Sequence, residues 1–338
     1  MFVLVIRIPK DFVINSQSHH DKYFMFEYLV NTFPETFKYI EPPDLITNST
    51  NLKKYFLDKF NALPDYLVSF KDFNELCIIY EELTSFSKLV VILYDIHHGK
   101  SIKRYRAPVL TKSYYILNNY GYMYNIYFPN HSGNIFFPHA LAYKIDFNIN
   151  PIKKILVSGH LNKEIYPDRY EMYIMSLNNN NIYYHKPDYT GYRVSQKDIN
   201  KTFGKNYYNL LNKYLCCFTD DACLNRPYIV AKFFEIMGSG SLLLASNENT
   251  KEEFEKIGFI DGIHYISCNI YNCQEKIDFI LNEANSKIIN EIRYNGYFLV
   301  NTNHDFEYRA NQLYCLLNNQ KKLQTYTSKY RTNYSLIE

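Results

Sequence analysis

The chain has 338 residues, of which 47% are hydrophobic and 21% charged. This is enough apolar material for a large core and for about two domains of roughly 100–200 residues each. A disordered or fibrous protein is excluded. Lys and Arg number 37 against 34 Asp and Glu, so the net charge of +3 is nearly neutral and no long basic run is present. Nucleic acid is therefore not an expected partner.

Tyrosine and cysteine content say little about function. The 35 Tyr and 24 Phe, with no Trp, are typical of an AT-rich genome, so we infer no stacking platform from their number. The seven Cys form no Cys-x-x-Cys pair, and Cys216 and Cys217 lie in an apolar run, which favours buried thiols in a reducing compartment. The apolar start Met1–Ile6 is too short for a signal peptide or a membrane span. We expect a cytoplasmic protein, in a host cell if the genome is viral.

Short apolar runs alternate with segments of helical period, which indicates α/β units around parallel sheets. In the first half we predict a helix at Asp21–Thr32 and strands at Phe2–Ile8, Tyr66–Phe70, Leu89–Tyr94 and Gly133–Phe137. The polar stretch Ala142–Lys154, interrupted by Pro151, is the predicted domain junction.

A second series of α/β units follows the junction. Strands are predicted at Lys154–Ser158, Asn181–His185, Tyr214–Phe218, Ser241–Ala245 and His264–Ser267. Helices are predicted at Pro167–Leu177, Val194–Leu211 (in most of it), Pro227–Met237, Lys251–Ile257 and from Tyr271 to about Asn318. The expected domains are 1–145 and 146–318, with 319–338 as a tail packing back on the first. Two such sheets are expected to face each other across a ligand-binding cleft.

The segment Asn225–Ala245 carries the main functional argument. Asn225 can cap a helix and Pro227 suits its first turn. Helical spacing then places Tyr228, Lys232, Glu235 and Ser239 on one polar face. The helix N-terminus and Lys232 suit a diphosphate, and Glu235 can accept both hydroxyls of a ribose. The spacing alone favours a plainer interpretation, a solvated Lys–Glu pair.

Lys154–Arg169 is a second candidate, with a strand, a Ser158-Gly159 turn and a helix opened by Pro167. Gly159 lets the backbone approach a ligand, and Arg169 near the helix start can reach a phosphate. An ordinary connection with a surface arginine fits the spacing equally well.

Three segments, Val230–Ala245, Phe254–Ile266 and Asn303–Leu313, resemble the C-terminal domain of GT-B glycosyltransferases of the "glycosyl transferases group 1" type. The closest subgroup is the spore-maturation-protein-like one, whose first C-domain strand and Tyr-Pro-x-Arg segment are similar to Lys154–Arg169. The resemblance implies GT-B architecture, two Rossmann-like domains facing across a cleft. It also implies a nucleotide-sugar site made by Ser158, Gly159, Arg169, Tyr228, Lys232 and Glu235.

Two features depart from that family. Many retaining members carry Glu-x7-Glu, but counting back from Glu235 gives Pro227 where the first Glu belongs. The first half also lacks the Gly-rich loop that often follows the first strand.

The first half offers Asp95, His97 and His98 after the strongest predicted strand. GT-B enzymes often place a histidine there, facing the donor sugar, so this group is the candidate catalytic set. A turn cap and surface histidines are the alternative. His139 suits core or hinge packing as well as the cleft. His19, His20 and Asp21 are interpreted as a helix cap rather than a metal site.

The resemblance thus implies a glycosyltransferase that moves a sugar from a nucleotide-sugar, with UDP favoured over GDP and retention over inversion. Thr219-Asp220-Asp221 lacks the Asp-x-Asp spacing of metal-dependent transferases, so Lys232, Arg169 and helix N-termini are expected to stabilise the leaving diphosphate without a metal or cofactor. The acceptor, whether glycan, protein or lipid, and the oligomeric state cannot be read. A non-catalytic nucleotide-binding relative and a sugar-nucleotide epimerase are the alternatives.

Overall fold

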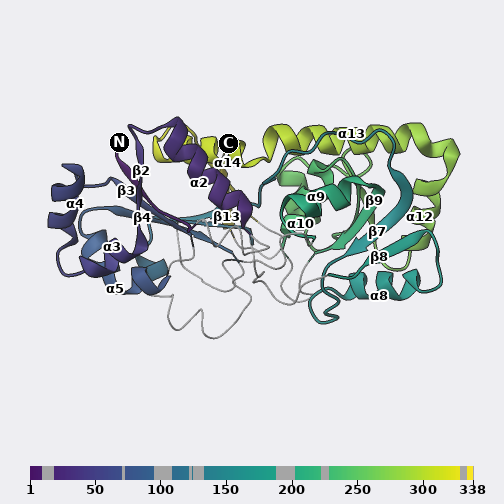
Figure 1. The fold of residues 1–338 in the computed structure, drawn as a ribbon, viewed down its shortest axis with the longest axis horizontal. Coiled ribbons are helices and arrows are strands. Elements are labelled where there is room, and N and C mark those ends of the chain that lie inside the picture. The colour runs from purple at the N-terminus through teal and green to yellow at the C-terminus, as the bar shows by residue number, and fades with distance from the viewer. Residues whose placement is uncertain are drawn as a thin grey trace. The chain divides into compact units, whose positions relative to one another are not determined.

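The computed structural model describes residues 1–9, 19–70, 73–94, 109–121, 124, 133–187, 202–221, 228–327 and 333–337. It is an α/β protein whose chain forms two compact units (Figure 1). The first contains residues 1–10, 22–138 and 309–338, and the second contains residues 11–21 and 139–308. The domain boundaries proposed from the sequence, after residues 145 and 318, remain predictions.

The first unit is built on an eight-stranded sheet in the order β12-β13-β6-β5-β4-β3-β1-β2. Every neighbouring pair is parallel except β12 and β13, which are antiparallel. Its strands are β1 (Val3–Ile6), β2 (Phe37–Ile40), β3 (Tyr66–Phe70), β4 (Lys88–Leu93), β5 (Tyr115–Asn118), β6 (Asn134–Phe136), β12 (Leu323–Thr327) and β13 (Asn333–Ile337). Its helices are α2 (His20–Thr32), which begins in the second unit, α3 (Pro42–Thr47), α4 (Leu52–Phe60), α5 (Phe73–Thr84) and α14 (Phe306–Leu317), most of which belongs here.

The second unit is built on a five-stranded parallel sheet in the order β11-β10-β9-β7-β8. Its strands are β7 (Ile152–Ser158), β8 (Ile182–His185), β9 (Tyr214–Asp220), β10 (Leu242–Ser246) and β11 (Ile266–Cys268). Its helices are α8 (Pro167–Ser176), α9 (Lys205–Asn212), α10 (Ala231–Gly238), α11 (Lys251–Lys256), α12 (Cys273–Leu281), α13 (Ser286–Asn303) and the short 3₁₀ helix η2 (Glu283–Asn285).

Side-chain alternation along the second sheet assigns the helices to its two faces. Cys216 and Phe218 of β9 join a core with Met172 of α8 and Ile277 of α12. The intervening Cys217 points the other way, where its thiol donates to Leu211 O of α9 at 3.7 Å. Both faces are therefore covered, which explains why the strand residues form continuous apolar runs.

The strand predicted at Tyr66–Phe70 is confirmed, and most other predicted elements are found with shifted ends. The strand predicted at Phe2–Ile8 spans only Val3–Ile6. Of the predicted helix Val194–Leu211, residues 194–201 lie outside the described residues, and α9 begins at Lys205. Strands β2, β5, β12 and β13 and helices α3, α4 and α5 had no counterpart in the sequence interpretation. No helix in the described ranges is long and apolar enough to cross a membrane.

The segment after β6 locks helix α10 in place within the second unit. Leu141 donates its N–H to His304 O at 2.8 Å and accepts one from Phe306 N at 3.1 Å. Its side chain fills a gap beside Gly238, where a Cβ atom would lie 2.2 Å from Leu141 Cδ1. Gly238 is thus required by close packing rather than by an unusual backbone angle.

Arg293 of α13 holds the chain just after the same end of α10. The side chain is 1% exposed, and Nη2 donates to Gly240 O at 2.8 Å and to Asn148 O at 3.0 Å. Burial lowers the pKa of Arg293 to about 10. A buried guanidinium therefore ties the junction segment to the end of α10.

We expect Gly238→Ala to lower the free energy of unfolding by about 1–3 kcal/mol, because the new methyl group overpacks against Leu141. In the absence of that contact, alanine inside a helix would stabilise the protein. Urea denaturation of both single variants and of Gly238→Ala/Leu141→Ala measures the coupling, and the cost of Gly238→Ala should shrink in the Leu141→Ala background. An unchanged or increased stability of Gly238→Ala would contradict the packing argument.

Candidate functional site

Strand β7 ends at a turn where two cationic side chains converge. Gly159 has φ +105°, a conformation that favours glycine. A Cβ atom there would lie 2.5 Å from Lys232 Nζ and 3.3 Å from Arg169 Nη1. We call the space bounded by Ser158, Gly159, Arg169 and Lys232 the Gly159 notch. All four residues belong to the second unit.

Lys232 lies on the first turn of α10 and points into the notch rather than to bulk solvent. Its Nζ donates to Ser158 O at 2.7 Å and lies 5.8 Å from the ring centroid of Tyr207. The Tyr207 hydroxyl is 2.8 Å from Ser158 Oγ. Burial, and then the positive charge of Arg169, lower the pKa of Lys232. The ammonium is thus held by one carbonyl beside another cation.

Helix α10 begins later than the sequence indicated, so its predicted start was wrong. Val230 is its N-cap with extended backbone (φ −81°, ψ 155°), and the Val230 side chain makes no capping hydrogen bond. The β-branched pair Ile229-Val230 favours this extended conformation. Tyr228 is buried and precedes the helix, so it does not belong to the helix's polar face. Asn225 and Pro227 lie outside the described residues.

Glu235 lies three residues after Lys232 on α10 and is partly buried. Burial, and to a lesser extent the nearby Asp21 carboxylate, raise its pKa, whereas Lys232 opposes the rise. No hydrogen bond or ion pair within the described residues engages its carboxylate. An acceptor group is therefore available one helical turn from the Lys232 ammonium.

Arg169 is 3% exposed and enters the notch from the first turn of α8. Its guanidinium packs on the ring of Tyr166, with Cζ 3.8 Å from the centroid. Nη2 faces the end of β9, where Thr219 and Asp220 lie, and Nη1 donates to His160 O at 3.4 Å. Burial and the charges of Lys232 and Arg169 lower the pKa of His160, which places that imidazole near both cations.

The structure brings Ser158, Gly159, Arg169 and Lys232 together, with Glu235 close by on α10. Asp95, His97 and His98 lie outside the described residues. Asp21, interpreted as a helix cap, accepts the backbone N–H of Ala140 at 3.0 Å and lies 3.8 Å from His139 Nδ1. Because that contact joins the start of α2 to the segment after β6, it is long-range and could not be read from local sequence.

Sequence reasoning missed the tyrosines around the notch. Tyr166 and Tyr207 cover the two cations, and the hydroxyl of Tyr184 donates to Gly159 O at 3.4 Å. Their number carried no signal because the whole chain is rich in tyrosine. The available signal was position, since Tyr184 lies near the end of β8, opposite Val157 in register.

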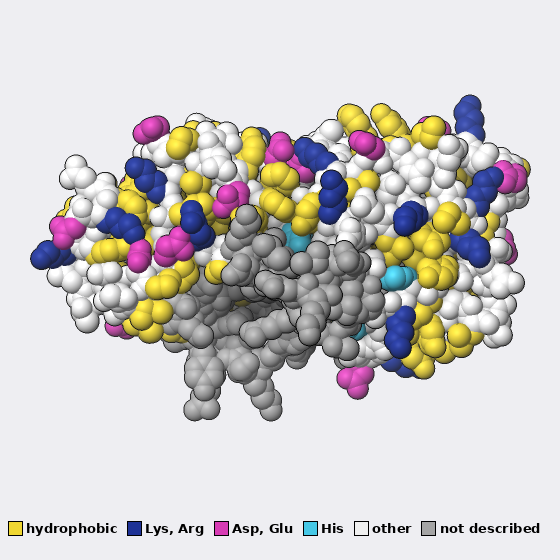
Figure 2. Space-filling view, in the orientation of Figure 1, with side chains coloured by type: hydrophobic (Ala, Val, Ile, Leu, Met, Phe, Trp, Pro, Cys, Tyr) yellow, Lys and Arg dark blue, Asp and Glu magenta, His cyan; other side chains and the backbone are white. Residues whose placement is uncertain are grey.

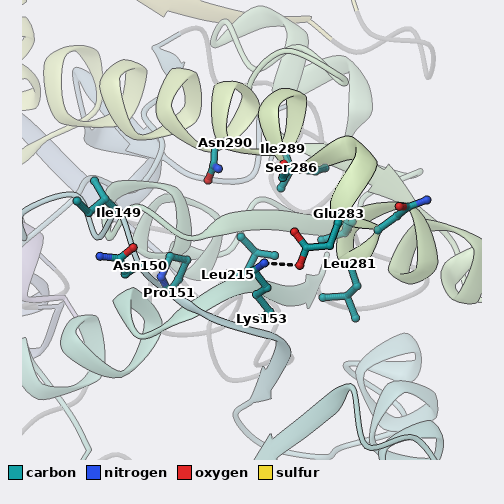
Figure 3. A pocket seen from close by; sticks show the side chains of 12 residues that line it. Ile149, Asn150, Pro151, Lys153, Leu215, Leu281, Glu283, Ser286, Ile289 and Asn290 are labelled. Atoms are coloured by element: carbon teal, nitrogen blue, oxygen red, sulfur yellow. Dashed lines mark hydrogen bonds and ion pairs between the residues drawn. The ribbon is translucent and has the colours of Figure 1, made fainter.

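A separate cavity of about 220 Å³ lies at the opposite, amino-terminal edge of the second sheet (Figure 3). It contains none of the predicted site residues. Apolar side chains from the junction, β9, α12 and α13 line it, and Lys153 and Glu283 form an exposed ion pair beside it. On the face drawn in Figure 2, basic and acidic side chains are intermingled rather than gathered in one patch.

No protein-family model and no curated protein sequence matches the chain. Similar solved structures include sucrose-phosphate synthase from Thermosynechococcus elongatus, with TM-score 0.58, 9% identity and coverage of 94% of this chain and 98% of that chain. Anabaena HepE in complex with UDP and glucose has TM-score 0.54 and 9% identity over 94% and 100%. A putative UDP-N-acetylglucosamine 2-epimerase from Listeria monocytogenes has TM-score 0.50 and 11% identity over 94% and 96%.

These likenesses establish the fold class. The chain is an α/β protein with the two parallel-sheet domains of GT-B glycosyltransferases, as the sequence indicated. The spore-maturation-protein-like subgroup remains a prediction. At 9–11% identity the likeness extends to the fold alone.

We expect Arg169→Met to lower the free energy of unfolding by about 3–5 kcal/mol at pH 8, because it leaves the buried Asp220 carboxylate without its cation. Burial already raises the pKa of Asp220 and Arg169 opposes it, so the substitution raises that pKa further. A carboxyl whose pKa is raised in the folded state lowers the free energy of unfolding at pH values above that pKa. This loss disappears as the pH falls and the carboxyl is protonated. The loss measured by urea denaturation should therefore be smaller at pH 5 than at pH 8.

The double variant Arg169→Met/Asp220→Asn serves as the control, because it removes the carboxylate charge as well. It should recover part of the stability at pH 8 and show a weaker pH dependence. An equal loss at both pH values would contradict the ion-pair explanation.

Proposed function

We propose that the protein is a glycosyltransferase whose second unit binds the diphosphate of a nucleotide-sugar at the Gly159 notch. One observation carries the proposal: Lys232 Nζ and Arg169 Nη1 converge on Gly159 at the carboxyl end of β7. Open parallel sheets place ligands at that end of their strands. The second unit would thus be the donor domain.

The electrostatics of the notch suit a diphosphate. Burial and the charge of Arg169 lower the pKa of Lys232, and a bound dianion would relieve that repulsion. The same cations would stabilise the negative charge that develops on the departing nucleotide when the sugar–phosphate bond breaks. By analogy with oxyanion-hole deletions, removing one such donor costs roughly 10²–10³-fold in rate.

Glu235 and the start of α10 extend the proposed site. Since the N-cap residue Val230 offers no side-chain acceptor, the first backbone N–H groups and positive dipole end of α10 favour an anion. The Glu235 carboxylate can accept both hydroxyls of a ribose. Tyr228 remains part of the proposed nucleotide-sugar site, although it lies before the helix.

The donor and chemistry follow as further parts of the proposal. UDP is favoured because the HepE structure holds UDP and glucose, although no residue here distinguishes uracil from guanine. We propose retention without a metal or cofactor, since Lys232 and Arg169 can supply the charge stabilisation. Pro227 stands in place of the first Glu of the family motif, so the carboxylate that contacts the donor sugar in that family is missing at this position. The acceptor is a glycan, protein or lipid.

A second candidate is a sugar-nucleotide epimerase, favoured by the fold likeness to the Listeria protein. Incubation with radiolabelled UDP- and GDP-sugars separates the candidates. Transfer or hydrolysis of the sugar supports a transferase, and an altered free nucleotide-sugar supports an epimerase. Binding without turnover indicates a non-catalytic relative.

We expect Lys232→Ala and Glu235→Ala each to weaken binding of the nucleoside diphosphate about 10–100-fold, the size of one lost charge-assisted contact. Calorimetric titration with UDP and GDP measures the affinities. Lys251→Ala and Glu255→Ala are matched controls, because both residues are exposed on α11 of the same unit. Unchanged affinity in both site variants, with the fold intact, would remove the basis for the site.

Asp95, His97 and His98 are proposed to act on the donor sugar. We expect His97→Ala to lower the turnover number more than the nucleotide affinity, because a group that works on the transition state contributes little to ground-state binding. Steady-state kinetics beside calorimetry separates the two effects. Wild-type kinetics in this variant would assign the segment to the scaffold.

A further inference from the structure

The last two residues of β9, Thr219 and Asp220, hold Arg169 from behind the notch. Asp220 is 2% exposed, and its Oδ2 accepts the backbone N–H of Arg169 at 3.0 Å. Its Oδ1 forms an ion pair with Arg169 Nη2 at 3.0 Å. Thr219 Oγ1 accepts from the same Nη2, also at 3.0 Å. One strand end thus supplies two hydrogen-bond acceptors and one ion-pair partner to one residue.

The backbone contact means that Asp220 caps α8 from another element. Arg169 is the third residue of that helix, and the N-cap residue Tyr166 makes no side-chain cap. The Asp220 carboxylate satisfies an N–H group that would otherwise be orphaned, and it occupies the positive end of the helix dipole. A bound anion would therefore have to be held by the Arg169 side chain rather than by this helix end.

The same contacts fix the orientation of the Arg169 guanidinium. Nη2 is used by Thr219 and Asp220, and the Tyr166 ring covers one face of the guanidinium. Nη1 is the nitrogen directed at Gly159, and its hydrogen bond to His160 O is long, at 3.4 Å. Arg169 therefore presents a preoriented donor to the notch.

The two cations are held by different partners. Lys232 is anchored on the Ser158 carbonyl and can serve one phosphate. Arg169 is compensated by Asp220, so it can remain beside Lys232 before a ligand arrives. Holding a donor in position in advance lowers the entropy cost of binding and raises affinity. The gain in affinity applies to the ligand group that contacts Arg169.

We propose that Asp220, with Thr219, is a positioning residue that holds Arg169 for the second phosphate and thereby makes the site select nucleoside diphosphates over monophosphates. This inference rests on the proposed function, because it assumes that the notch binds a nucleotide. It explains how the site would distinguish two phosphates from one, which neither Arg169 nor Lys232 explains alone.

Calorimetry of the full chain with UDP, UMP, GDP and GMP tests the proposal. Asp220→Asn keeps the size of the side chain but removes the charge that pairs with Nη2. We expect the wild-type protein to bind the diphosphate more tightly than the monophosphate, and Asp220→Asn to reduce that ratio about 10-fold through weaker diphosphate binding. A residue with a merely structural role would weaken both ligands equally.

Asp221→Asn is the matched control, because this neighbouring carboxyl accepts from Thr250 Oγ1 at 3.3 Å instead of holding Arg169. Its ratio should equal that of the wild type. Should Asp220→Asn fail to fold, Thr219→Val removes one Nη2 acceptor without a charge and should lower the ratio by a smaller factor, about 3-fold.

The outcomes separate the two proposals. A folded Asp220→Asn or Thr219→Val variant with the wild-type ratio overturns the role of this pair and leaves the nucleotide site standing. A wild-type protein that binds none of the four nucleotides overturns both.

Discussion

The Lys232 ammonium rests on the Ser158 carbonyl beside the guanidinium of Arg169, and the candidate site depends on this placement of two like charges. Each cation has an anionic neighbour, Asp220 for Arg169 and Glu235 for Lys232. The two carboxylates differ in their contacts. Asp220 pairs with Arg169 behind the notch, whereas no hydrogen bond or ion pair from the described part of the chain engages the Glu235 carboxylate. The pair of cations is thus stabilised from one side and left available on the other.

The parallel sheet explains why residues so distant in sequence meet. β7, β9 and β10 all run in one direction, so Ser158, Asp220 and Ser246 end at the same edge. Ser246 Oγ donates to Asp168, and Asp220 accepts the N–H of Arg169, so two strand ends fix the first turn of α8. Gly159 then allows the turn that both cations approach. Each contact is a consequence of topology rather than of local preference.

Much of the fold followed from apolar periodicity, because buried parallel strands are continuous apolar runs bounded by polar turns. The roles proposed for Lys232 and Arg169 came from their places near helix starts together with a family resemblance, and the structure adds the distances between them. The start of α10 was misplaced because Pro227 suits a helix, whereas Ile229-Val230 extends the chain to Ala231. The contacts of Asp220 with Arg169 and of Tyr207 with Ser158 were missed because the partners lie about 50 residues apart, and a single sequence carries no signal for such contacts.

Unfavourable electrostatics persist in the notch because the surrounding structure cannot relax. Moving α10 outward would separate Lys232 from Arg169, but Leu141 fills the gap at Gly238 and Arg293 holds the Gly240 carbonyl. Close-packed interiors resist such shifts, so packing one helix length away keeps a desolvated cation in place. That arrangement lowers the stability of the free protein, and binding of the proposed anion would offset the loss. The rigid end of α10 therefore supports the anion site proposed at its start.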